Sequence, residues 1–505
     1  MINNCLQYLE YNALNYGEKL ALADESFSLT YKEYMEKAKV IGSFIAKKTN
    51  STTNSPIAVL IDRNIASIVT FMGIVYSGNF YVPVDALMPK ERIELIYKTL
   101  NPILVIDARQ KDVSEEGTVK YEDILDSSEI EEGLLKSIRD NAIDTDPLYT
   151  IFTSGSTGVP KGVCVCHRSM IDLVNSFEEA FDFKHETVFG NQAPFDFDVS
   201  AKDIYNALKV GGTVQVLPKK LFKMPKMLVG YLIERKVSTL IWAVSALRIV
   251  SDFKTMEDGD VPKLENIMFS GEVMPVKALN YWMDKVPNAR YVNLYGPTEI
   301  TCNCTYFEIK KRFNDDEMLP IGKAFKNTRV ILKDEKGAVI KEKGKVGEIC
   351  VMGTCLALGY WNNKEKTDAA FINNPNISAY EQKMYATGDM GYYNDDNDIV
   401  FASRRDFQIK HMGHRIELGE IEVALNAIPN LDVSCCLYDK ENEKIVCFYQ
   451  AKEECKKEIV MELSKKLPKF MWPNVYVHYE ELPMNKNGKI DRVKLSETFK
   501  KSEEK

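Results

Sequence analysis

Alternating strand and helix patterns in the first part of the chain restrict its fold more than any other feature. Apolar runs typical of buried strands lie at Ile57–Ile61, Phe80–Val84 and Leu104–Asp107, with helical patterns between them at Ile65–Ser77 and Pro89–Leu100. Parallel strands need a long crossover connection, which is usually a helix. The alternation continues to about residue 285 and therefore predicts a parallel sheet with helices on both faces.

The spacing of the strand patterns changes after about residue 320. Strand-like segments at Arg329–Lys333, Val346–Met352 and Asp398–Ala402 follow one another closely, and a compact mixture of strands and helices begins near Asp406. We predict an α/β fold: a large N-terminal domain of mixed or parallel sheets flanked by helices, with a small β-rich subdomain, and a small mobile α+β C-terminal domain. The expected boundaries are 1–403 for the large domain, about 320–403 for its subdomain, 404–408 for a hinge and 409–505 for the small domain.

Charge and composition argue against several classes of protein. A net charge of −8 over 505 residues is unsuited to non-specific nucleic-acid binding, which depends on neutralising phosphates. The N-terminus lacks the basic start and apolar stretch of a signal peptide, and no apolar run is long enough for a membrane span. Without a secretion signal, the 11 cysteines are expected to be free thiols in a reducing cytosol. We expect a cytoplasmic monomer that binds neither nucleic acid nor membrane.

A loop rich in glycine and hydroxyl groups lies between two apolar runs, Leu148–Phe152 and Val163–Cys166. Glycines let backbone N–H groups approach an anion, and hydroxyls and a lysine add further donors, so the loop is expected to bind phosphate. It is not a Walker loop, because Pro160 stands where the second glycine is required and a strand follows instead of a helix. The candidate residues are Thr153, Ser154, Gly155, Ser156, Thr157, Gly158 and Lys161.

A second cluster, Tyr295–Thr301, combines an aromatic ring, a Gly-Pro turn, a hydroxyl and a carboxylate. The ring of Tyr295 can stack on a base, and the hydroxyl of Thr298 can reach a phosphate. Glu299 can bind Mg²⁺, which prefers oxygen ligands. Taken alone, this segment is more typical of a turn after a strand than of a binding site.

Three further polar residues have two interpretations each. Asp389 follows a glycine turn, where a carboxylate often holds ribose hydroxyls, but such turns are also common without a ligand. Asp198 lies before a helix predicted at Ala201–Lys209, either as a helix N-terminal anion or as a carboxylate at a pocket mouth, suited to an ammonium group. Lys489 lies on a glycine-containing loop and, taken alone, is more typical of a solvated side chain.

In this order, the segments closely resemble the adenylate-forming superfamily, which includes acyl-CoA synthetases, luciferases and adenylation domains of nonribosomal peptide synthesis. The resemblance extends from Leu29–Tyr31 to Lys489. It is closest to the amino-acid-activating branch, and above all to stand-alone D-alanine:carrier protein ligases. Three segments suit that group: FDFDVS at 195–200, DFQIK at 406–410 and PMNKNGKIDR at 483–492.

The resemblance implies a ligase that works in two steps. Carboxylate attack on the α-phosphate of Mg·ATP gives an acyl-adenylate and pyrophosphate, and the phosphopantetheine thiol of a separate carrier protein then displaces AMP. It implies that the loop at 153–161, with Lys161, holds the β- and γ-phosphates, and that the small domain rotates about Asp406 between the steps. The other implied roles are adenine binding by Tyr295 and Gly296, ribose binding by Asp389 and Arg404, catalysis by Lys489, Thr298 and Glu299, Mg²⁺ binding by Glu299, ammonium binding by Asp198 and a thiol tunnel at Gly413.

By the same resemblance, a pocket for the substrate side chain is expected, and Lys202 leaves its chemistry open. Lys202 lies four positions after Asp198, so the two share a helix face. If Lys202 points inward, it can pair with an acidic side chain; if outward, the pocket suits a small apolar amino acid such as alanine. Lysines are mostly solvated, so we expect it to point outward. The residues expected to line the pocket are Val199, Lys202, Leu247, Met268, Ser270, Leu294, Cys302 and Asn303.

Two other functions remain as alternatives. An acyl-CoA ligase for a carboxylic acid without an amino group would not be expected to carry an aspartate at the position of Asp198. A non-catalytic nucleotide-binding module on the same fold would not be expected to keep Lys161, Glu299, Asp389 and Lys489 together. The sequence departs from the family pattern at Ser403, where glycine is usual, and at Val244–Leu247, where proline is common.

Overall fold

The computed structural model of the protein describes residues 2–109, 117–155, 158–256, 261–315, 317–404, 408–429, 431–484 and 490–503. These residues belong to two compact units. The first contains Met1–Asp85, Leu100–Ile151 and Gly162–Arg405, and the second contains Ala86–Thr99, Phe152–Lys161 and Asp406–Lys505. Neither unit is a single continuous stretch of the chain, because the second unit includes two segments from the first third of the sequence. The boundaries expected from the sequence, 1–403, 404–408 and 409–505, stay a prediction.

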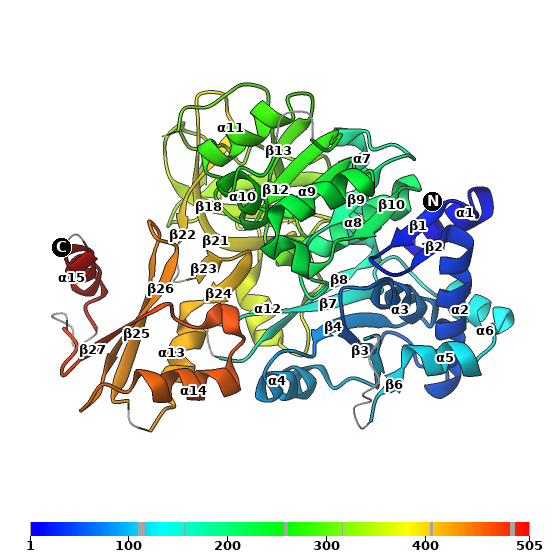
Figure 1. The fold of residues 1–505 in the computed structure, drawn as a ribbon, viewed down its shortest axis with the longest axis horizontal. Helices are drawn as coiled ribbons and strands as arrows, with labels where there is room; N and C mark the ends of the chain where they lie inside the picture. Colours follow the sequence, from blue (N-terminus) through cyan, green and yellow to red (C-terminus); the bar gives the residue numbers. More distant parts are fainter. Residues whose placement is uncertain are drawn as a thin grey trace. The chain divides into compact units, whose positions relative to one another are not determined.

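A seven-stranded sheet, whose strands apart from β19 come from the first half of the chain, has the order β19-β8-β7-β4-β3-β5-β6. Strand β3 pairs in parallel with both β4 and β5, and helix α3 packs on β3 and β4 (Figure 1). The predicted parallel sheet is therefore confirmed here. The bounds are β3 Pro56–Ile61, β4 Phe80–Asp85, β5 Leu104–Asp107, β6 Val119–Lys120, β7 Pro147–Thr153, β8 Lys161–Cys166, β19 Gly359–Tyr360 and α3 Ile65–Tyr76.

A nine-stranded sheet follows the order β15-β14-β13-β12-β11-β9-β10-β1-β2. The strands from β13 to β1 pair in parallel, whereas β14, β15 and β2 add antiparallel edges. The parallel ladder brings the carboxyl ends of its strands to one edge, where ligands of α/β sheets usually bind. The bounds are β1 Leu20–Ala23, β2 Ser28–Thr30, β9 Val188–Asn191, β10 Thr213–Val216, β11 Thr239–Ala243, β12 Asn266–Ser270, β13 Arg290–Tyr295, β14 Thr305–Ile309 and β15 Lys323–Ala324.

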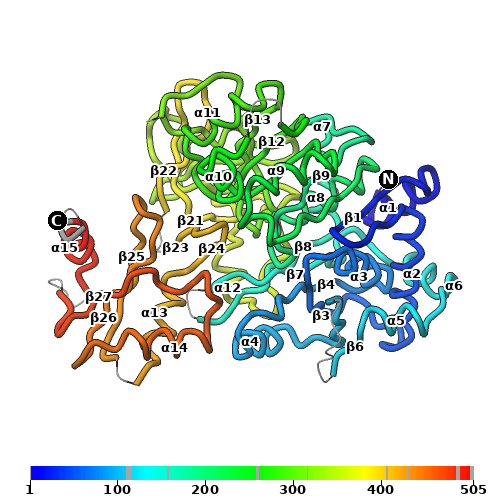
Figure 2. Tube along the Cα trace, in the orientation of Figure 1, coloured from blue at the N-terminus to red at the C-terminus, as the bar shows by residue number. Residues whose placement is uncertain are grey.

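Alternate residues of the central strands face two different hydrophobic cores, because successive side chains of a strand point to opposite faces. Met268 on β12 belongs to the core that also contains Ile204 of helix α8. Its neighbours Ile267 and Phe269 belong to a second core, which contains residues of α10 and α11. Helix α8 contacts β9, β10 and β11, and α10 contacts β11 and β12 (Figures 1 and 2). These helices are α8 Val199–Val210, α10 Val244–Asp252 and α11 Val276–Lys285.

The remaining helices of the first unit include several with clear sequence signals. Thr30 caps α2 in a capping box with Glu33, as the predicted N-cap requires. Every residue of α3 is buried, so this helix has no solvent face. The bounds are α1 Leu6–Asn15, α2 Tyr31–Lys48, α5 Tyr121–Ser127, α6 Glu132–Asp140, α7 His167–Phe181, η1 Lys219–Lys223, α9 Pro225–Glu234, η2 Thr298–Ile300 and α12 Lys364–Ala370.

A third sheet forms the β-rich part of the first unit. Its order is β17-β16-β18-β21-β20, and β22 pairs with β21. The turn expected at Gly388 is wrong, because this residue lies inside the eleven-residue strand β21. Gly388 has a φ of +70°, and the pairing with β18 shifts register nearby, so the glycine allows a local irregularity without ending the strand. The bounds are β16 Thr328–Lys333, β17 Val339–Ile340, β18 Gly347–Gly353, β20 Phe371–Asn373, β21 Lys383–Tyr393 and β22 Ile399–Arg404.

The second unit combines a hairpin and a three-stranded sheet with helices. Met412 and Gly413 connect the hairpin β23–β24, and both have positive φ, as a type I′ turn requires. Strands β25 and β26 pair antiparallel, and β26 and β27 pair in parallel. The bounds are α4 Lys90–Leu100, β23 Gln408–His411, β24 His414–Glu417, α13 Leu418–Asn426, β25 Val433–Asp439, β26 Lys444–Gln450, α14 Lys456–Lys466, η3 Lys469–Met471, β27 Val475–Tyr479 and α15 Arg492–Glu503.

All 11 cysteines are free thiols, as predicted, and 10 of them are buried. Burial raises the pKa of Cys164 to about 12, so this thiol stays protonated at neutral pH. Among the described helices, none combines the length and the apolar character needed to cross a membrane.

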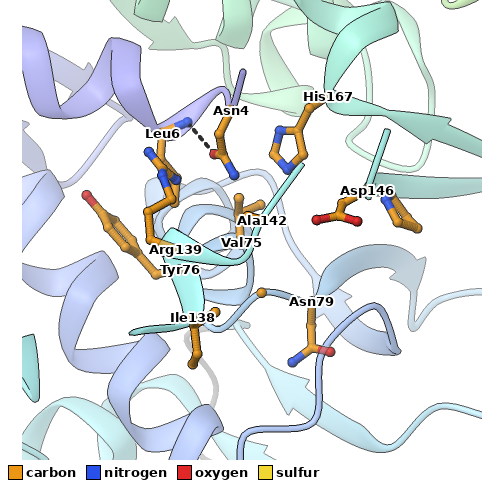
Figure 3. Close-up of a pocket in the computed structure, with 12 residues that line it drawn as sticks. Asn4, Leu6, Val75, Tyr76, Asn79, Ile138, Arg139, Ala142, Asp146 and His167 are labelled. Atoms are coloured by element: carbon orange, nitrogen blue, oxygen red, sulfur yellow. Dashed lines mark hydrogen bonds between the residues drawn. The ribbon is translucent and has the colours of Figure 1, made fainter. Parts of the chain in front are cut away.

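A cavity of about 20 Å³ lies where the N-terminal segment meets α3, α6 and the start of α7 (Figure 3). This volume suffices for about one water molecule. His167 lines the cavity, and its Nδ1 accepts a hydrogen bond of 3.2 Å from the backbone N–H of Cys5. Burial, together with the nearby charge of Arg139, lowers the pKa of His167 from 6.5 to about 3. The histidine therefore ties the N-terminal helix to the core as a neutral ring.

We expect His167 to make the protein less stable in acid. The unfolded chain takes up a proton at His167 near pH 6.5, whereas the folded chain resists protonation until about pH 3. Its contribution to stability is therefore present above pH 6.5 and is lost as the pH falls towards 3. In His167→Asn, the free energy of unfolding from urea titrations should vary less with pH across this range. A parallel loss of stability in both proteins would contradict the buried neutral ring.

Candidate functional site

A buried carboxylate connects two sheets of the first unit. Tyr295, the last residue of β13, donates a hydrogen bond from its hydroxyl to Asp389 Oδ2 at 2.5 Å. Arg404 at the end of β22 donates from Nη1 to Asp389 Oδ1, also at 2.5 Å. Asp389 and Arg404 face each other across the β21–β22 pair, and Asp389 is 2% exposed. The structure thus brings together three residues that the sequence assigned to one nucleotide.

The environment of Tyr295 keeps its phenol protonated and its ring in place. Burial raises the pKa of Tyr295 well above its usual value, and the negative charge of Asp389 raises it further. A protonated phenol can donate to the carboxylate, which holds the ring at the carboxyl end of β13. The Thr387 hydroxyl accepts a hydrogen bond of 3.0 Å from the backbone N–H of Asp389, which helps to fix the backbone at this position.

The short helix η2 follows Tyr295 and carries Thr298 and Glu299, which are both buried. Tyr360 donates its hydroxyl to Glu299 Oε1 at 2.8 Å. Gly296 is required at the turn, because a Cβ there would lie 2.6 Å from Asn303 Cα. A divalent cation such as Mg²⁺ is commonly bound by one or two carboxylates together with substrate phosphates, and the buried carboxylate of Glu299 fits that role.

The glycine- and hydroxyl-rich loop belongs to the second unit, where its donors contact carboxylates. The backbone N–H of Gly155 donates to Glu420 Oε2 at 3.0 Å, and Lys161 Nζ lies 3.7 Å from Glu417 Oε1. The Ser154 hydroxyl donates to the Arg415 carbonyl at 2.8 Å. The donors of the loop thus contact carboxylates within this unit, and phosphate binding by the loop stays a prediction. Two of its candidate residues, Ser156 and Thr157, lie outside the described residues.

Two glycines of the loop have tightly restricted surroundings. A Cβ at Gly155 would lie 2.1 Å from the carbonyl oxygen of Val159, so any side chain there would force the turn open. Gly158 has a φ of +80°, which side chains of L-residues rarely adopt. Thr153 Oγ1 is buried and has no hydrogen-bond partner among the described residues.

An ion pair between Arg92 and Glu420 lies behind the loop, and sequence reasoning did not identify it. The two side chains are only 7% and 1% exposed, and Arg92 Nη1 donates to Glu420 Oε1. Burial raises the pKa of Glu420, while the charge of Arg92 opposes this shift. Glu417 and Glu420 are three residues apart at the start of α13, which places them on one side of it. The spacing of these two glutamates after the Gly413 turn is the sequence feature that could have indicated their shared position.

The outward orientation expected for Lys202 is wrong. Lys202 is 0% exposed, and its Nζ donates to Ser270 Oγ at 3.0 Å. The reason is that every residue of α8 from Ser200 to Leu208 is buried, so the helix offers Lys202 no solvent face. Burial lowers the pKa of Lys202, and the nearby Cys302, Asp198 and Asp203 oppose this shift.

Asp198 occupies the N-cap position of α8, but its side chain does not cap the helix. It is only half-buried, and the Cys302 thiol donates to its backbone carbonyl at 3.1 Å. The carboxylate is thus not used by the first turn of the helix, which leaves the ammonium-binding interpretation open. Val199, the next residue, is also half-buried.

The structure brings most of the expected pocket residues to one face of the nine-stranded sheet. Met268, Leu294 and Cys302 belong to the core that contains α8, and Ser270 lies two residues after Met268 on the same strand face. Asn303 is 2% exposed, and neither polar atom of its side chain has a hydrogen-bond partner in the described structure. Leu247 is the exception, because it belongs to the second core on the opposite face.

Three expected residues of the small domain have different outcomes. Gly413 is described and forms the β23–β24 turn, but nothing in the structure tests its role in a thiol tunnel. Lys489, the expected catalytic lysine, and Asp406, the expected hinge, lie outside the described residues. Their roles stay predictions from the resemblance.

Comparison with known proteins establishes the family. Residues 9–361 match the family model described as AMP-binding enzyme. This chain belongs to that family. It is 32% identical over 501 residues to the D-alanine–D-alanyl carrier protein ligase of Bacillus licheniformis, covering 95% of this chain and 96% of that protein. It is 29% identical over 504 residues to the ligase of the same name from Bacillus cytotoxicus, with 97% and 98% of the two chains covered.

A solved structure has a similar fold. The Vibrio cholerae adenylation domain AlmE, in complex with glycyl-adenosine-5′-phosphate, has a TM-score of 0.82 and covers 99% of this chain and 98% of its own. The two sequences are 19% identical, so this likeness concerns the fold. It agrees with the predicted α/β class.

We expect Asp389→Asn to weaken AMP binding. An amide accepts hydrogen bonds with one atom only and carries no charge, so it cannot hold Tyr295 and Arg404 as the carboxylate does. Hydrogen bonds to charged groups contribute about 1.5–3 kcal/mol, so the dissociation constant should rise roughly 10-fold to 100-fold. Isothermal titration with AMP measures this. Asp396→Asn, at an exposed turn, should bind AMP like the wild type; equal affinity in all three proteins would contradict the role of Asp389.

Proposed function

We propose that this protein is an AMP-forming ligase that activates an amino acid with ATP and transfers it to a carrier protein. In the first step an aminoacyl-AMP forms and pyrophosphate leaves, and in the second the phosphopantetheine thiol of a separate carrier displaces AMP. One observation carries this proposal. A buried carboxylate, Asp389, joins Tyr295 and Arg404 in a chain that matches carrier protein ligases over nearly its full length.

The nucleotide would be held by the network of Tyr295, Asp389 and Arg404 and by the loop at 153–161. Tyr295 offers its ring to adenine, and Asp389 with Arg404 offers hydrogen-bonding groups to the ribose. The backbone N–H of Gly155 and the ammonium of Lys161 suit the phosphates, because they already contact carboxylate groups. Glu299, near Thr298, would hold Mg²⁺, which when bound neutralises negative charge on the phosphates.

The amino acid would be oriented by its two charged ends. Asp198 is suited to the ammonium group, because it is a half-buried carboxylate next to Cys302, one of the expected pocket residues. Lys489 would bridge the carboxylate of the amino acid and the α-phosphate, as the family resemblance implies. Such positioning lowers the barrier by bringing two mutually repelling anions into contact distance.

The contact between Gly155 and Glu420 bears on how the two steps alternate. The Gly155 N–H donates to the carboxylate of Glu420, so it cannot at the same time donate to a phosphate of ATP. We therefore propose that Glu420 leaves the loop when ATP binds and returns when pyrophosphate has left. Movement of residues 409–505 relative to the loop, about the hinge expected at Asp406, would provide this exchange.

A pyrophosphate-exchange panel tests the proposed function. ATP, Mg²⁺ and radiolabelled pyrophosphate are incubated with the protein and, one at a time, the 20 L-amino acids, D-alanine, aryl acids and fatty acids. We expect amino-acid-dependent exchange, followed by transfer to a phosphopantetheinylated carrier that mass spectrometry detects. Exchange with aryl or fatty acids only would establish an acyl-CoA type of ligase instead, and exchange with no acid would overturn the proposal.

Asp198→Asn should raise the KM for the amino acid and leave the KM for ATP unchanged. The substitution removes the charge that attracts the ammonium group, and charge-assisted hydrogen bonds are roughly twice as strong as neutral ones. We expect the amino-acid KM to rise about 10-fold or more. Asp196→Asn, in the same segment, is the matched control and should leave both constants close to wild type. An unchanged amino-acid KM in Asp198→Asn would rule out this ammonium partner.

Glu420→Gln should lower the KM for ATP and slow the thiol-transfer step. A neutral amide competes with phosphate for the Gly155 N–H less strongly than a carboxylate does, so we expect the KM to fall roughly threefold or more. Transfer from a preformed adenylate should become slower, because the contact between Glu420 and the Gly155 N–H, to which Glu420 is proposed to return for this step, is weaker in the variant. Glu422→Gln, on the same helix but paired with Arg492, is the control. An unchanged or higher KM for ATP in Glu420→Gln would contradict the competition.

A further inference from the structure

Lys202 has a fully buried side chain with few hydrogen-bond partners. Within the part of the chain that the structure describes, Nζ donates one hydrogen bond, to Ser270 Oγ at 3.0 Å, and forms no ion pair. An ammonium group has three N–H donors, and buried charges are normally paired or fully hydrogen-bonded. A lysine in this position therefore suggests a ligand that supplies the missing acceptor.

The position of Lys202 in the sheet places it close to the nucleotide residues. Ser270 is the last residue of β12, and Tyr295 is the last residue of β13. These two strands are parallel neighbours, so their carboxyl ends meet at the same edge. Lys202 is thus anchored at the edge that carries the Tyr295–Asp389–Arg404 network.

The charges around Lys202 do not neutralise it completely. Burial raises the pKa of Asp203 from 3.8 to about 8, so this carboxyl group is mostly protonated at neutral pH. Its Oδ2 accepts a hydrogen bond of 2.9 Å from Asn191 rather than from Lys202. Asp198 lies one helical turn before Lys202 and is assigned to the substrate ammonium. A carboxylate from the substrate would complete the balance of charge.

Two neutral donors accompany the ammonium at this edge. Ser270 contributes its hydroxyl, which already contacts Lys202. Asn303 contributes a carboxamide that is 2% exposed and has no hydrogen-bond partner among the described residues at either polar atom. Asn303 follows Cys302, whose thiol contacts the backbone of Asp198, so the Asn303 backbone lies near the start of α8. A carboxylate can accept hydrogen bonds from an ammonium group, a hydroxyl group and an amide N–H.

We propose that Lys202, with Ser270 and Asn303, binds a side-chain carboxylate, so that the preferred substrate is a dicarboxylic amino acid. This inference rests on the proposed function and specifies its substrate class. Alanine, whose side chain is a methyl group, would leave the ammonium and the amide without an acceptor. A site with buried polar groups rejects ligands that cannot pair with them by large factors.

The wild-type enzyme provides the first test. Pyrophosphate exchange is measured with L- and D-glutamate, L- and D-aspartate, their side-chain amides, and L- and D-alanine. We expect one diacid to have a kcat/KM about 100-fold or more above those of its own amide and of alanine. The comparison of acid with amide isolates the charge, because the two side chains have nearly the same size and shape.

The second test changes the lysine. Lys202→Met keeps the length of the side chain and removes its charge. Its kcat/KM for the preferred diacid should fall about 100-fold or more, with little change for the amide. Lys209→Met, on the same helix but paired with Glu178 at the surface, is the matched control and should behave as wild type. Thermal unfolding and AMP titration of both variants show whether they remain folded and bind nucleotide.

The outcomes separate this inference from the proposed function. If alanine or another uncharged amino acid has the highest kcat/KM, the protein is still an amino-acid ligase, and the assignment of Lys202 is wrong. If Lys202→Met is folded and uses the diacid as well as wild type does, the assignment is likewise wrong. If no amino acid supports exchange, the proposed function fails and this inference fails with it.

Discussion

The arrangement of Tyr295 and Arg404 in the first unit depends on their hydrogen bonds to the carboxylate of Asp389. This carboxylate accepts from Tyr295 at the end of one sheet and from Arg404 on another, while only 2% exposed. A buried charge is tolerable only when it is paired and hydrogen-bonded, so the three side chains must keep their positions together. Because they must stay together, an aromatic ring, a carboxylate and a guanidinium group lie side by side at the carboxyl edge of the nine-stranded sheet.

Two other buried charges indicate where ligands bind and leave. Glu420 is paired with Arg92 and accepts the Gly155 N–H, so the phosphate loop of the second unit already carries an anion. Lys202 is buried with one hydroxyl as its hydrogen-bond partner among the described residues. The first charge has its partners within the protein and, in the proposed function, competes with phosphate. The second is incompletely paired, which points to a carboxylate on the substrate.

Much of the fold followed from local patterns, and the exceptions have clear causes. Strand β5 has the predicted bounds, and β3 and β4 differ from theirs by one residue each, because apolar periodicity decides such segments. Gly388 was taken as a turn, but pairing with β18 and β22 on both sides keeps it within β21. Lys202 was expected in solvent because most lysines are solvated, and packing on all sides of α8 overrides that tendency. Leu247 was assigned to the pocket, but α10 turns it into the opposite core.

The sequence by itself determined the order of strands and helices and the resemblance that the family match later confirmed. These properties depend on residues that are close together in the chain. Only the tertiary structure decided that Asp389 joins Tyr295 to Arg404, that Glu420 reaches Gly155 and that Lys202 is buried beside Ser270. Such contacts link residues far apart in sequence, and the charge states they impose depend on burial, which no local pattern specifies.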